Sequence, residues 1–285
     1  MKTCKPPDPN PTTPRVALPP GACDAHCHVF GPADRFPYAP ERSYTPPDAA
    51  VAALRALHRT LGIARAVIVQ ASCHGTDNAA MLDCIASDPK RYRGVAIVDD
   101  SFKDADYDRL HRGGVRGVRF NFVKHLGGAP DMAVFNRVID RIKGRGWHVV
   151  LHLDAPDVIP LSGMIRRLPL PFIVDHMGRV PSAAGIDQPP LRALLELAKL
   201  ENCWIKVCGS ERISMPPYTA AVPIAHALVT AAPERVLWGT DFPHPNATHE
   251  ADEADLVDLI PQFAPEALAQ RRLLVENPLP LYDFK

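Results

Sequence analysis

From about residue 21 onward, the sequence alternates between short apolar runs and longer segments with helical periodicity. Apolar runs without polar alternation are typical of strands that helices cover on both faces of a parallel sheet. Eight such strands are predicted: Ala22–Phe30, Ala66–Gln70, Arg93–Val98, Gly117–Phe122, His148–Leu153, Phe172–Asp175, Cys203–Cys208 and Arg235–Trp238. Eight strand–helix units favour an α/β fold of the closed (β/α)8 TIM-barrel type, which needs about 250 residues.

The segments between and after these strands are predicted to be helices, over residues 49–60, 77–87, 104–112, 130–143, 159–167, 190–200, 219–231, 252–263 and 265–276. An open doubly wound sheet is the alternative. No Gly-x-Gly-x-x-Gly motif follows a strand, which disfavours dinucleotide binding. Residues 1–20 contain seven prolines, so we expect an extended arm there and a single domain over residues 21–285.

The charge balance argues against several partners. The chain has 32 basic and 32 acidic residues, so nothing indicates a nucleic-acid partner. No apolar stretch approaches the ~20 residues of a membrane span, and no secretion signal is recognisable. An odd number of cysteines, seven, mostly in apolar runs, favours reduced thiols. We therefore expect a cytoplasmic protein with no membrane partner, and the sequence leaves open whether it is a monomer or a homo-oligomer.

Histidines and an aspartate stand where the predicted strands end. His26 and His28 end the first strand, His152 the fifth and His176 the sixth, while Asp241 follows the eighth. Barrel enzymes build their active sites at these carboxyl ends, so the five side chains should meet in one pocket. His26 and His28 are two residues apart and should point the same way. A His-x-His pair alone is a weak signal, but its combination with the other three residues is a strong one.

Arginines at three strand ends indicate an anionic substrate. Arg119, Arg179 and Arg212 offer planar guanidinium groups, which suit carboxylates or sulfonates. The alternative is that each arginine pairs with a nearby acid, as Arg212 could with Glu211.

The remaining histidines have simpler interpretations. His58, His111 and His226 fall in predicted helices and are expected at the surface. His74 and His249 are expected in loops at the barrel rim.

Five longer stretches carry a family resemblance: Asp24–Gly31, Val69–Asn78, Gly117–Phe122, Asp175–Arg179 and Trp238–Asn246. In them the chain resembles the amidohydrolase superfamily over about residues 21–285, and it is most similar to the branch of 2-pyrone-4,6-dicarboxylate lactonases and 4-sulfomuconolactone hydrolases. The resemblance implies a (β/α)8 barrel whose Asp241 acts as general base on water. It places His26, His28 and the catalytic His176 around the ester carbonyl. It implies substrate contacts by Tyr44, Ser72, Arg119, His125, Arg179, Arg212 and His244.

Two positions depart from the pyrone lactonase pattern. His125 stands where that family has a second arginine, which removes a permanent positive charge, and His152 stands where it has a tyrosine. The pyrone lactonase works without a metal, whereas metal-dependent relatives use the residues matched here by His26, His28, His152 and Asp241. We therefore predict one divalent ion, Zn²⁺, on these four residues, with metal-free catalysis as the alternative.

The predicted function is hydrolysis of a small anionic lactone, carboxylated or sulfonated, in bacterial catabolism of aromatic compounds. The substrate is expected to be of the 4-sulfomuconolactone or 2-pyrone-4,6-dicarboxylate type, opened by attack of water on the ring ester. An alternative is a metal-dependent, non-oxidative decarboxylase of an aromatic or muconate-type acid. A third is a non-catalytic barrel that binds a sugar or an acid.

Overall fold

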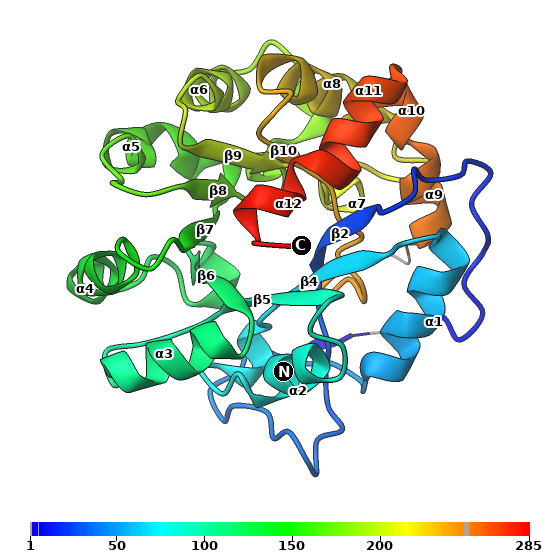
Figure 1. Ribbon diagram of the computed structural model, residues 1–285. Coiled ribbons are helices and arrows are strands. Elements are labelled where there is room, and N and C mark those ends of the chain that lie inside the picture. The colour runs from blue at the N-terminus through cyan, green and yellow to red at the C-terminus, as the bar shows by residue number, and fades with distance from the viewer. Residues whose placement is uncertain (1, 5, 248–250) are drawn as a thin grey trace.

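The predicted barrel is present. The computed structural model describes residues 2–4, 6–247 and 251–285, so the predicted rim residue His249 lies outside the described residues. Eight parallel strands pair in chain order: β2 (Cys23–Cys27), β4 (Arg65–Val69), β5 (Tyr92–Ala96), β6 (Val115–Asn121), β7 (His148–His152), β8 (Phe172–Val174), β9 (Cys203–Lys206) and β10 (Val236–Leu237). Figure 1 looks into the ring of strands, with the helices outside it. The carboxyl ends of all eight strands therefore meet at one mouth.

Hydrogen bonds between β2 and the segment around β10 join the two ends of the sheet. Ala25 N donates to Trp238 O, and Asp241 N donates to His26 O, each at 2.8 Å. The buried Asp24 carboxylate adds side-chain bonds across the same seam: Oδ2 accepts from Thr240 Oγ1 at 2.6 Å. The strand that carries the two histidines is thus fastened directly beside Asp241.

A bulge in β2 sets which of its side chains face the barrel interior. Asp24 pairs with Ala66 but Cys27 pairs with Ile68, so β2 has one residue more than β4 between the two pairs. Such an extra residue reverses the inward and outward alternation of the side chains. As a result Cys23 belongs to the lower interior core, while His26 reaches the interior of the upper half.

Twelve α-helices are described: α1 (Val51–Leu61), α2 (Ala79–Ala86), α3 (Asp104–Arg112), α4 (Met132–Ile142), α5 (Ala155–Ile165), α6 (Pro189–Ala198), α7 (Ser210–Ile213), α8 (Val222–Ala231), α9 (Glu253–Asp258), α10 (Ile260–Phe263), α11 (Ala267–Arg271) and α12 (Pro278–Leu281). The sequence prediction missed α7 and α12, and it expected two continuous helices over residues 252–263 and 265–276, where the structure has the shorter α9, α10 and α11. Pro261 lacks an N–H and lies where α9 gives way to α10. A π-helical turn over Arg272–Glu276 follows α11.

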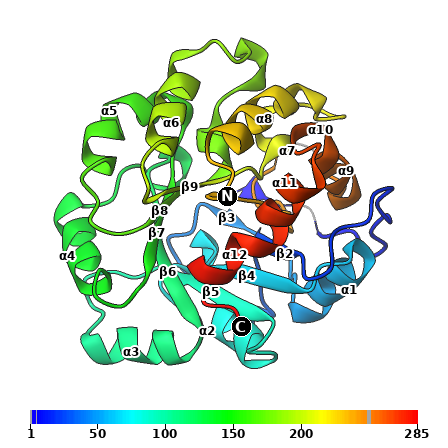
Figure 2. The ribbon, with the colours of Figure 1, turned by 45° about the horizontal axis from the view of Figure 1, so that its top comes forward.

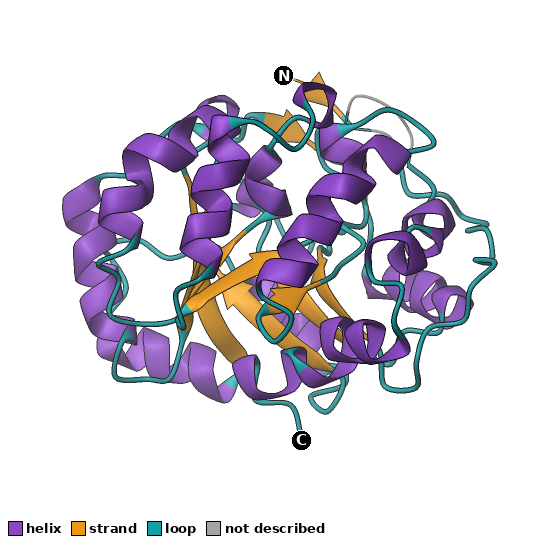
Figure 3. Cartoon of the chain, turned by 90° about the horizontal axis from the view of Figure 1, so that it is seen from above, coloured by secondary structure: helices purple, strands orange, loops and turns teal. Residues whose placement is uncertain are grey.

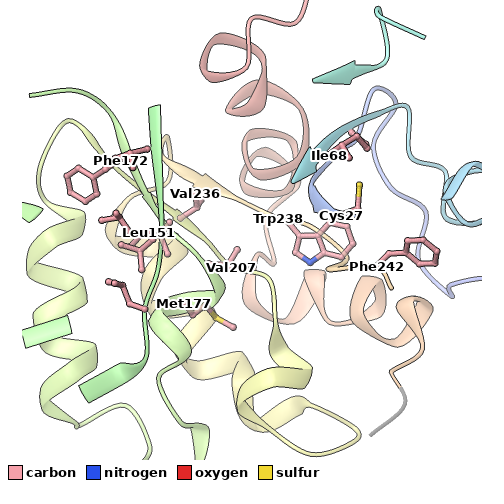
Figure 4. Packing of buried hydrophobic residues seen from close by; sticks show 14 of the residues in the cluster. Cys27, Ile68, Leu151, Phe172, Met177, Val207, Val236, Trp238 and Phe242 are labelled. Atoms are coloured by element: carbon pink, nitrogen blue, oxygen red, sulfur yellow. The ribbon is translucent and has the colours of Figure 1, made fainter. Parts of the chain in front are cut away.

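Two hydrophobic cores support the barrel. The larger lies between strands and helices, and Figure 4 shows some of its members, including Ile68, Leu151 and Phe172. The smaller lies inside the barrel, where Tyr282 and Phe284 from the C-terminal segment join the inward strand residues. Figures 1 and 2 show α12 and the C-terminus crossing the end of the barrel. Figure 3 places the N-terminus at the opposite end, so the C-terminal segment closes the mouth away from the histidines.

The N-terminal segment contacts the rest of the chain at several places, one of them a bond from Asn246 N to Cys4 Sγ. The short strand β1 (Lys2–Thr3) pairs with β3 (Tyr44–Thr45), and Arg15 Nε lies 2.7 Å from Asp258 Oδ2 on α9. The division into an arm and one domain remains a prediction. Among the described residues, no helix is long and apolar enough to span a membrane.

All seven cysteines fall among the described residues and are free thiols, as expected. The expectation for His58 was wrong. Its side chain is fully buried, with Nε2 3.2 Å from Asp24 Oδ2, because the inner face of α1 packs against β2 at this point. His111 and His226 are exposed, as predicted.

Candidate active site

A pocket opens at the carboxyl ends of the strands. Its described lining is His28, Tyr44, Ser72, Arg119, His125, Leu126, His152, His176, Arg179, Arg212, Asp241, Pro245 and Asn246. Nearly every residue predicted to act on a substrate is therefore in one place. Of the predicted site residues, His26 is fully buried and does not line this pocket, and His244 is also absent from the lining.

Asp241 lies at the centre of the histidines. Its Oδ1 is 3.4 Å from His28 Nε2 and 3.6 Å from His26 Nε2, and its Oδ2 is 3.9 Å from His176 Nδ1. These residues come from β2, from the turn after β8 and from the loop after β10. Asp241 Oδ1 is buried and has no hydrogen-bond partner among the described residues. The arrangement presents one unused carboxylate oxygen to a cluster of imidazoles.

Arg212 holds the other oxygen of Asp241. Its Nε donates to Oδ2 at 2.6 Å, and its Nη1 donates to Pro245 O at 2.7 Å. Burial alone would raise the pKa of Asp241, but Arg212, together with His176, His28 and His26, holds it well below its ordinary value. Asp241 is therefore a carboxylate across the neutral pH range.

The Nδ1 atoms of His28, His152 and His176 each lie beside a defined protein atom. His28 Nδ1 donates to Val69 O at 2.8 Å, which leaves a lone pair on Nε2 in the neutral ring. His152 Nδ1 lies 2.9 Å from Asn121 Oδ1, and its Nε2 is buried without a partner among the described residues. His176 Nδ1 lies 3.4 Å from the Cys208 thiol.

Two arginines keep donors available toward the pocket. Arg119 Nε donates to Asp175 Oδ2 at 3.0 Å, and Arg179 Nε donates to Asp154 Oδ1 at 2.8 Å. The described residues provide no hydrogen-bond acceptor for the terminal Nη groups of either side chain. Arg212, in contrast, uses Nε, Nη1 and Nη2 on protein atoms. Arg119 and Arg179 are thus better placed than Arg212 to receive an anion.

A buried ion pair beneath the histidines was not predicted. Lys206 Nζ, at the end of β9, lies 3.2 Å from Asp175 Oδ1 and 3.0 Å from His26 Nδ1, and both charged side chains are fully buried. A lysine inside an otherwise apolar strand was the available signal, since lysine is almost never fully buried without a partner.

Strained backbone concentrates in the two turns that carry the site. Asp241 has φ 61° and His176 has φ 49°, in the left-handed region that residues other than glycine rarely adopt. Arg179 (φ 50°), His244 (φ 55°) and Asn246 (φ 63°) share this conformation. Such strain costs on the order of 1–3 kcal/mol per residue and persists where the surroundings fix it, which is typical of functional sites.

Comparison with known proteins places this barrel in a family. The family model described as amidohydrolase matches residues 23–284. The chain belongs to the amidohydrolase family. A 2-pyrone-4,6-dicarboxylate hydrolase from Comamonas testosteroni is 47% identical, with 96% of this chain and 93% of the relative covered. A 4-sulfomuconolactone hydrolase from Rhizobium radiobacter is 40% identical, with 93% and 91% covered.

A solved structure agrees with this amidohydrolase fold. It is described as a probable 2-pyrone-4,6-dicarboxylic acid hydrolase from Acinetobacter baumannii with citric acid bound. It superposes with a TM-score of 0.82 at 26% identity, with 93% of this chain and all of the other covered.

His244 of this amidohydrolase lies behind the pocket rather than on its wall. Its Nδ1 is 3.4 Å from Glu211 Oε1 and its Nε2 is 3.3 Å from Glu253 Oε1. Burial lowers the pKa of His244, but the two glutamates outweigh it and raise the pKa to about 10. The side chain is thus a buried imidazolium between two acids, and substrate contact by His244 stays a prediction without geometric support.

Among the described residues, two candidate groups for a metal share the pocket residue Asp241: His26, His176 and Asp241, and Glu211, Asp241 and His244, with the ligand atoms of each group within 4.8 Å of one another. In the described part of the chain, neither His28 nor His152 belongs to such a group. A tetrahedral zinc site needs all its ligand atoms about 3.3–3.5 Å apart. Lys206 and Arg212 also place positive charges on two of the three ligands of the first group. Asp241 Oδ1 lies close to this spacing from His28 Nε2 and His26 Nε2, at 3.4 and 3.6 Å, but His152 is not gathered with them, so zinc on the predicted set of four residues stays a prediction.

Proposed function

We propose that this chain is a hydrolase that opens a small anionic lactone by attack of water on the ring ester, in the bacterial breakdown of aromatic compounds. The observation that carries the proposal is Asp241 Oδ1, a buried carboxylate oxygen without a described partner, which faces imidazoles in a pocket lined by arginines. Supporting it, the two relatives named above are hydrolases of a pyrone dicarboxylate and of a sulfonated lactone.

Asp241 is the general base of the proposed reaction. Oδ1 takes one proton from a water molecule as the water oxygen attacks the carbonyl carbon, while Arg212 keeps Oδ2 in place. The lowered pKa makes Asp241 a weak base, so proton transfer accompanies attack rather than preceding it. When the tetrahedral intermediate collapses, the ring C–O bond breaks and the proton passes to the leaving enol or alcohol oxygen.

His176, which lines the pocket, stabilises the charge that develops on the carbonyl oxygen, and His26 packs against it from beneath, with the ring centroids 4.6 Å apart. Burial, with Lys206 for His26 and with His26 and Arg212 for His176, lowers the pKa of both imidazoles, so each is neutral at pH 7. A neutral imidazole can donate one N–H bond to an oxyanion. Such a donor in a site from which water is excluded contributes about 10²–10³ to the rate.

Arg119 and Arg179 bind the acidic groups of the substrate through their terminal nitrogens, aided by Tyr44 and Ser72, which line the same pocket. The bound citric acid in the Acinetobacter protein supports a polyanionic ligand class. His125 gives this wall a titratable group where the pyrone lactonases carry an arginine. The proposed substrate is therefore a lactone with a carboxylate or sulfonate, of the 2-pyrone-4,6-dicarboxylate or 4-sulfomuconolactone type.

Zinc remains a prediction of the sequence. No step above passes through a metal, because His28 and His152 belong to neither of the two candidate ligand groups that include Asp241 among the described residues.

The test is a panel assay with purified protein. The panel contains 2-pyrone-4,6-dicarboxylate, 4-sulfomuconolactone and an uncharged pyrone. We expect proton release with ring opening for at least one anionic lactone and none for the uncharged pyrone. Release of CO₂ instead would favour the decarboxylase alternative. No reaction on any anionic lactone would contradict the proposed function.

A further inference from the structure

Lys206 lies beneath the active site and is not among the described residues that line the pocket. It ends β9 inside the barrel, and its side chain is fully buried. Its Nζ lies 3.0 Å from His26 Nδ1 and 3.2 Å from Asp175 Oδ1. Burying a charged group costs free energy unless the group is paired and hydrogen-bonded, so these two contacts must offset the cost of burying Lys206.

Asp175 is the counter-ion of Lys206. Its other oxygen, Oδ2, accepts from Arg119 Nε at 3.0 Å. Burial raises the pKa of Asp175, but Lys206, His26 and Arg119 outweigh burial and lower it well below its ordinary value. Asp175 is therefore a carboxylate that lies between two basic side chains, Lys206 and Arg119.

The contact between Lys206 and His26 decides where His26 carries its hydrogen. An ammonium has three donors and no acceptor, so His26 Nδ1 must accept. A neutral imidazole that accepts at Nδ1 has its hydrogen on Nε2. The competing partner of Nδ1 is Asp175 Oδ1 at 3.3 Å, but this oxygen makes no hydrogen bond of acceptable geometry with any described residue.

His28 has the opposite arrangement. Its Nδ1 hydrogen goes to Val69 O, so Nε2 presents a lone pair in the neutral ring. The two histidines of the His-x-His pair therefore differ in chemistry although both point at Asp241 Oδ1, at 3.6 Å and 3.4 Å. Ligand histidines ordinarily donate their second N–H to a carboxylate or carbonyl, which His28 does and His26 does not.

We infer that Lys206 is a positioning residue that fixes His26 with its hydrogen on Nε2, facing the general base Asp241, and thereby withholds His26 from metal binding. The catalytic part of this inference rests on the proposed lactone hydrolysis. The tautomer and the metal preference do not depend on the substrate. Removing the ammonium frees Nδ1 to donate to Asp175, which moves the hydrogen from Nε2 to Nδ1 and leaves a lone pair facing Asp241.

The primary experiment measures the His26 tautomer in the wild-type protein by ¹⁵N NMR of histidine-labelled, metal-free enzyme. The His26 signals are assigned by their absence from His26→Gln. We expect a protonated Nε2 and an unprotonated Nδ1. The opposite tautomer in the folded wild-type protein overturns the inference, and this measurement needs no Lys206 variant to fold.

The second experiment compares Lys206→Met with Lys206→Arg and with Lys199→Met, a control at an exposed lysine that pairs with Glu196. In Lys206→Met we expect the hydrogen on Nδ1, at least tenfold tighter Zn²⁺ binding in a chelator competition, and a kcat about 10²-fold lower with KM little changed. Lys206→Arg should keep the wild-type tautomer, and Lys199→Met should match the wild type throughout. An unchanged His26 tautomer in folded Lys206→Met overturns the inference.

The two readouts separate this inference from the proposed function. If the wild-type protein opens no lactone but His26 carries its hydrogen on Nε2 and Lys206→Met shifts it, the proposed function fails and the positioning role stands. If lactones are hydrolysed but Lys206→Met changes neither the Zn²⁺ affinity nor the tautomer of His26, the positioning role fails and the function stands.

Discussion

Arg212 binds only one of the two oxygens of Asp241, with Nε at 2.6 Å and Nη2 at 2.5 Å from Oδ2, and leaves Oδ1 open toward the histidines. The ion pair therefore orients the carboxylate without blocking the oxygen that would take a proton from water. Since Asp241 also has a left-handed backbone (φ 61°), its side chain is fixed at both ends. Oδ2 thus orients the carboxylate, and Oδ1 is left to accept the proton.

Asp241→Asn should abolish most turnover while leaving substrate binding nearly intact. The amide keeps the size and the contact with Arg212 but cannot accept the proton of water. We expect kcat to fall by about 10³-fold or more, and KM to change by less than about threefold. Steady-state kinetics on the best lactone of the panel measures both constants. A variant that keeps more than a tenth of the wild-type kcat would rule out Asp241 as the base.

Arg179→Met should weaken binding of the anion more than it slows chemistry. Arg179 uses only Nε on Asp154 and, with its terminal nitrogens, faces the pocket. Losing one charge-assisted contact should raise KM by roughly tenfold, the equivalent of about 1.5 kcal/mol. Arg192→Met, at an exposed arginine that pairs with Asp187, is the matched control and should leave KM unchanged. An unaltered KM in Arg179→Met would place the anion elsewhere.

The sequence predicted the architecture and most of the pocket because both depend on local pattern. Apolar runs mark buried strands, and in a parallel barrel the ends of such runs must meet, so the pattern alone was enough to place His152, His176 and Asp241 together. The bulge in β2 could not be predicted, since it is a relation between the registers of β2 and β4. Without it, His26 would point outward into the helix layer.

Contacts between polar residues that lie far apart along the chain could not be predicted from the sequence either. Asp175 ends one predicted strand and Lys206 lies within the next, but their proximity to His26 depends on the order of β8, β9 and β2 around the ring. His58 was expected at the surface because a helical histidine usually is. The turn of α1 that carries it faces the seam of the barrel, where Asp24 takes its hydrogen bond.

Asp24→Ala should destabilise the fold by about 3 kcal/mol or more. Asp24 is fully buried and accepts from His26 N, Thr240 N, Thr240 Oγ1 and His58 Nε2. Its removal leaves these buried donors unsatisfied, and each loss costs about 1–3 kcal/mol before relaxation. Urea denaturation followed by circular dichroism gives the free energy of unfolding. Glu201→Ala at an exposed position is the control. Equal stability of both variants would contradict the stabilising role of the Asp24 bonds that join β2 to the segment around β10.

Stability should fall as the pH drops below 6.5, with His148 as one cause. His148 is buried in the barrel interior, where its ring packs edge-on against Tyr282 at 5.1 Å. Burial, followed by Lys206, lowers its pKa to about 3. Between pH 6.5 and about 3 the unfolded chain binds a proton here that the folded chain does not, so the free energy of unfolding decreases with falling pH.

The size of this effect is on the order of a few kcal/mol, at about 1.4 kcal/mol per pH unit. His148→Phe retains an aromatic ring but cannot bind a proton, so denaturation curves between pH 7 and 4 should show a shallower loss of stability than in the wild type. His226→Phe, at an exposed position, should follow the wild-type slope. A variant as acid-sensitive as the wild type would show that His148 titrates normally.

Removal of divalent metal should leave the hydrolase active. Lys206 donates to His26 and Arg212 binds Asp241, so two of the three ligand candidates in the group of His26, His176 and Asp241 already contact cations. We expect less than about 0.2 zinc per chain by elemental analysis of protein purified without added metal, and unchanged kcat after treatment with a chelator. Lys206→Met, which frees His26, should take up more zinc under the same conditions. One zinc per wild-type chain, with activity lost on chelation and restored by zinc, would instead establish the metal site on His26, His28, His152 and Asp241 that the sequence predicts.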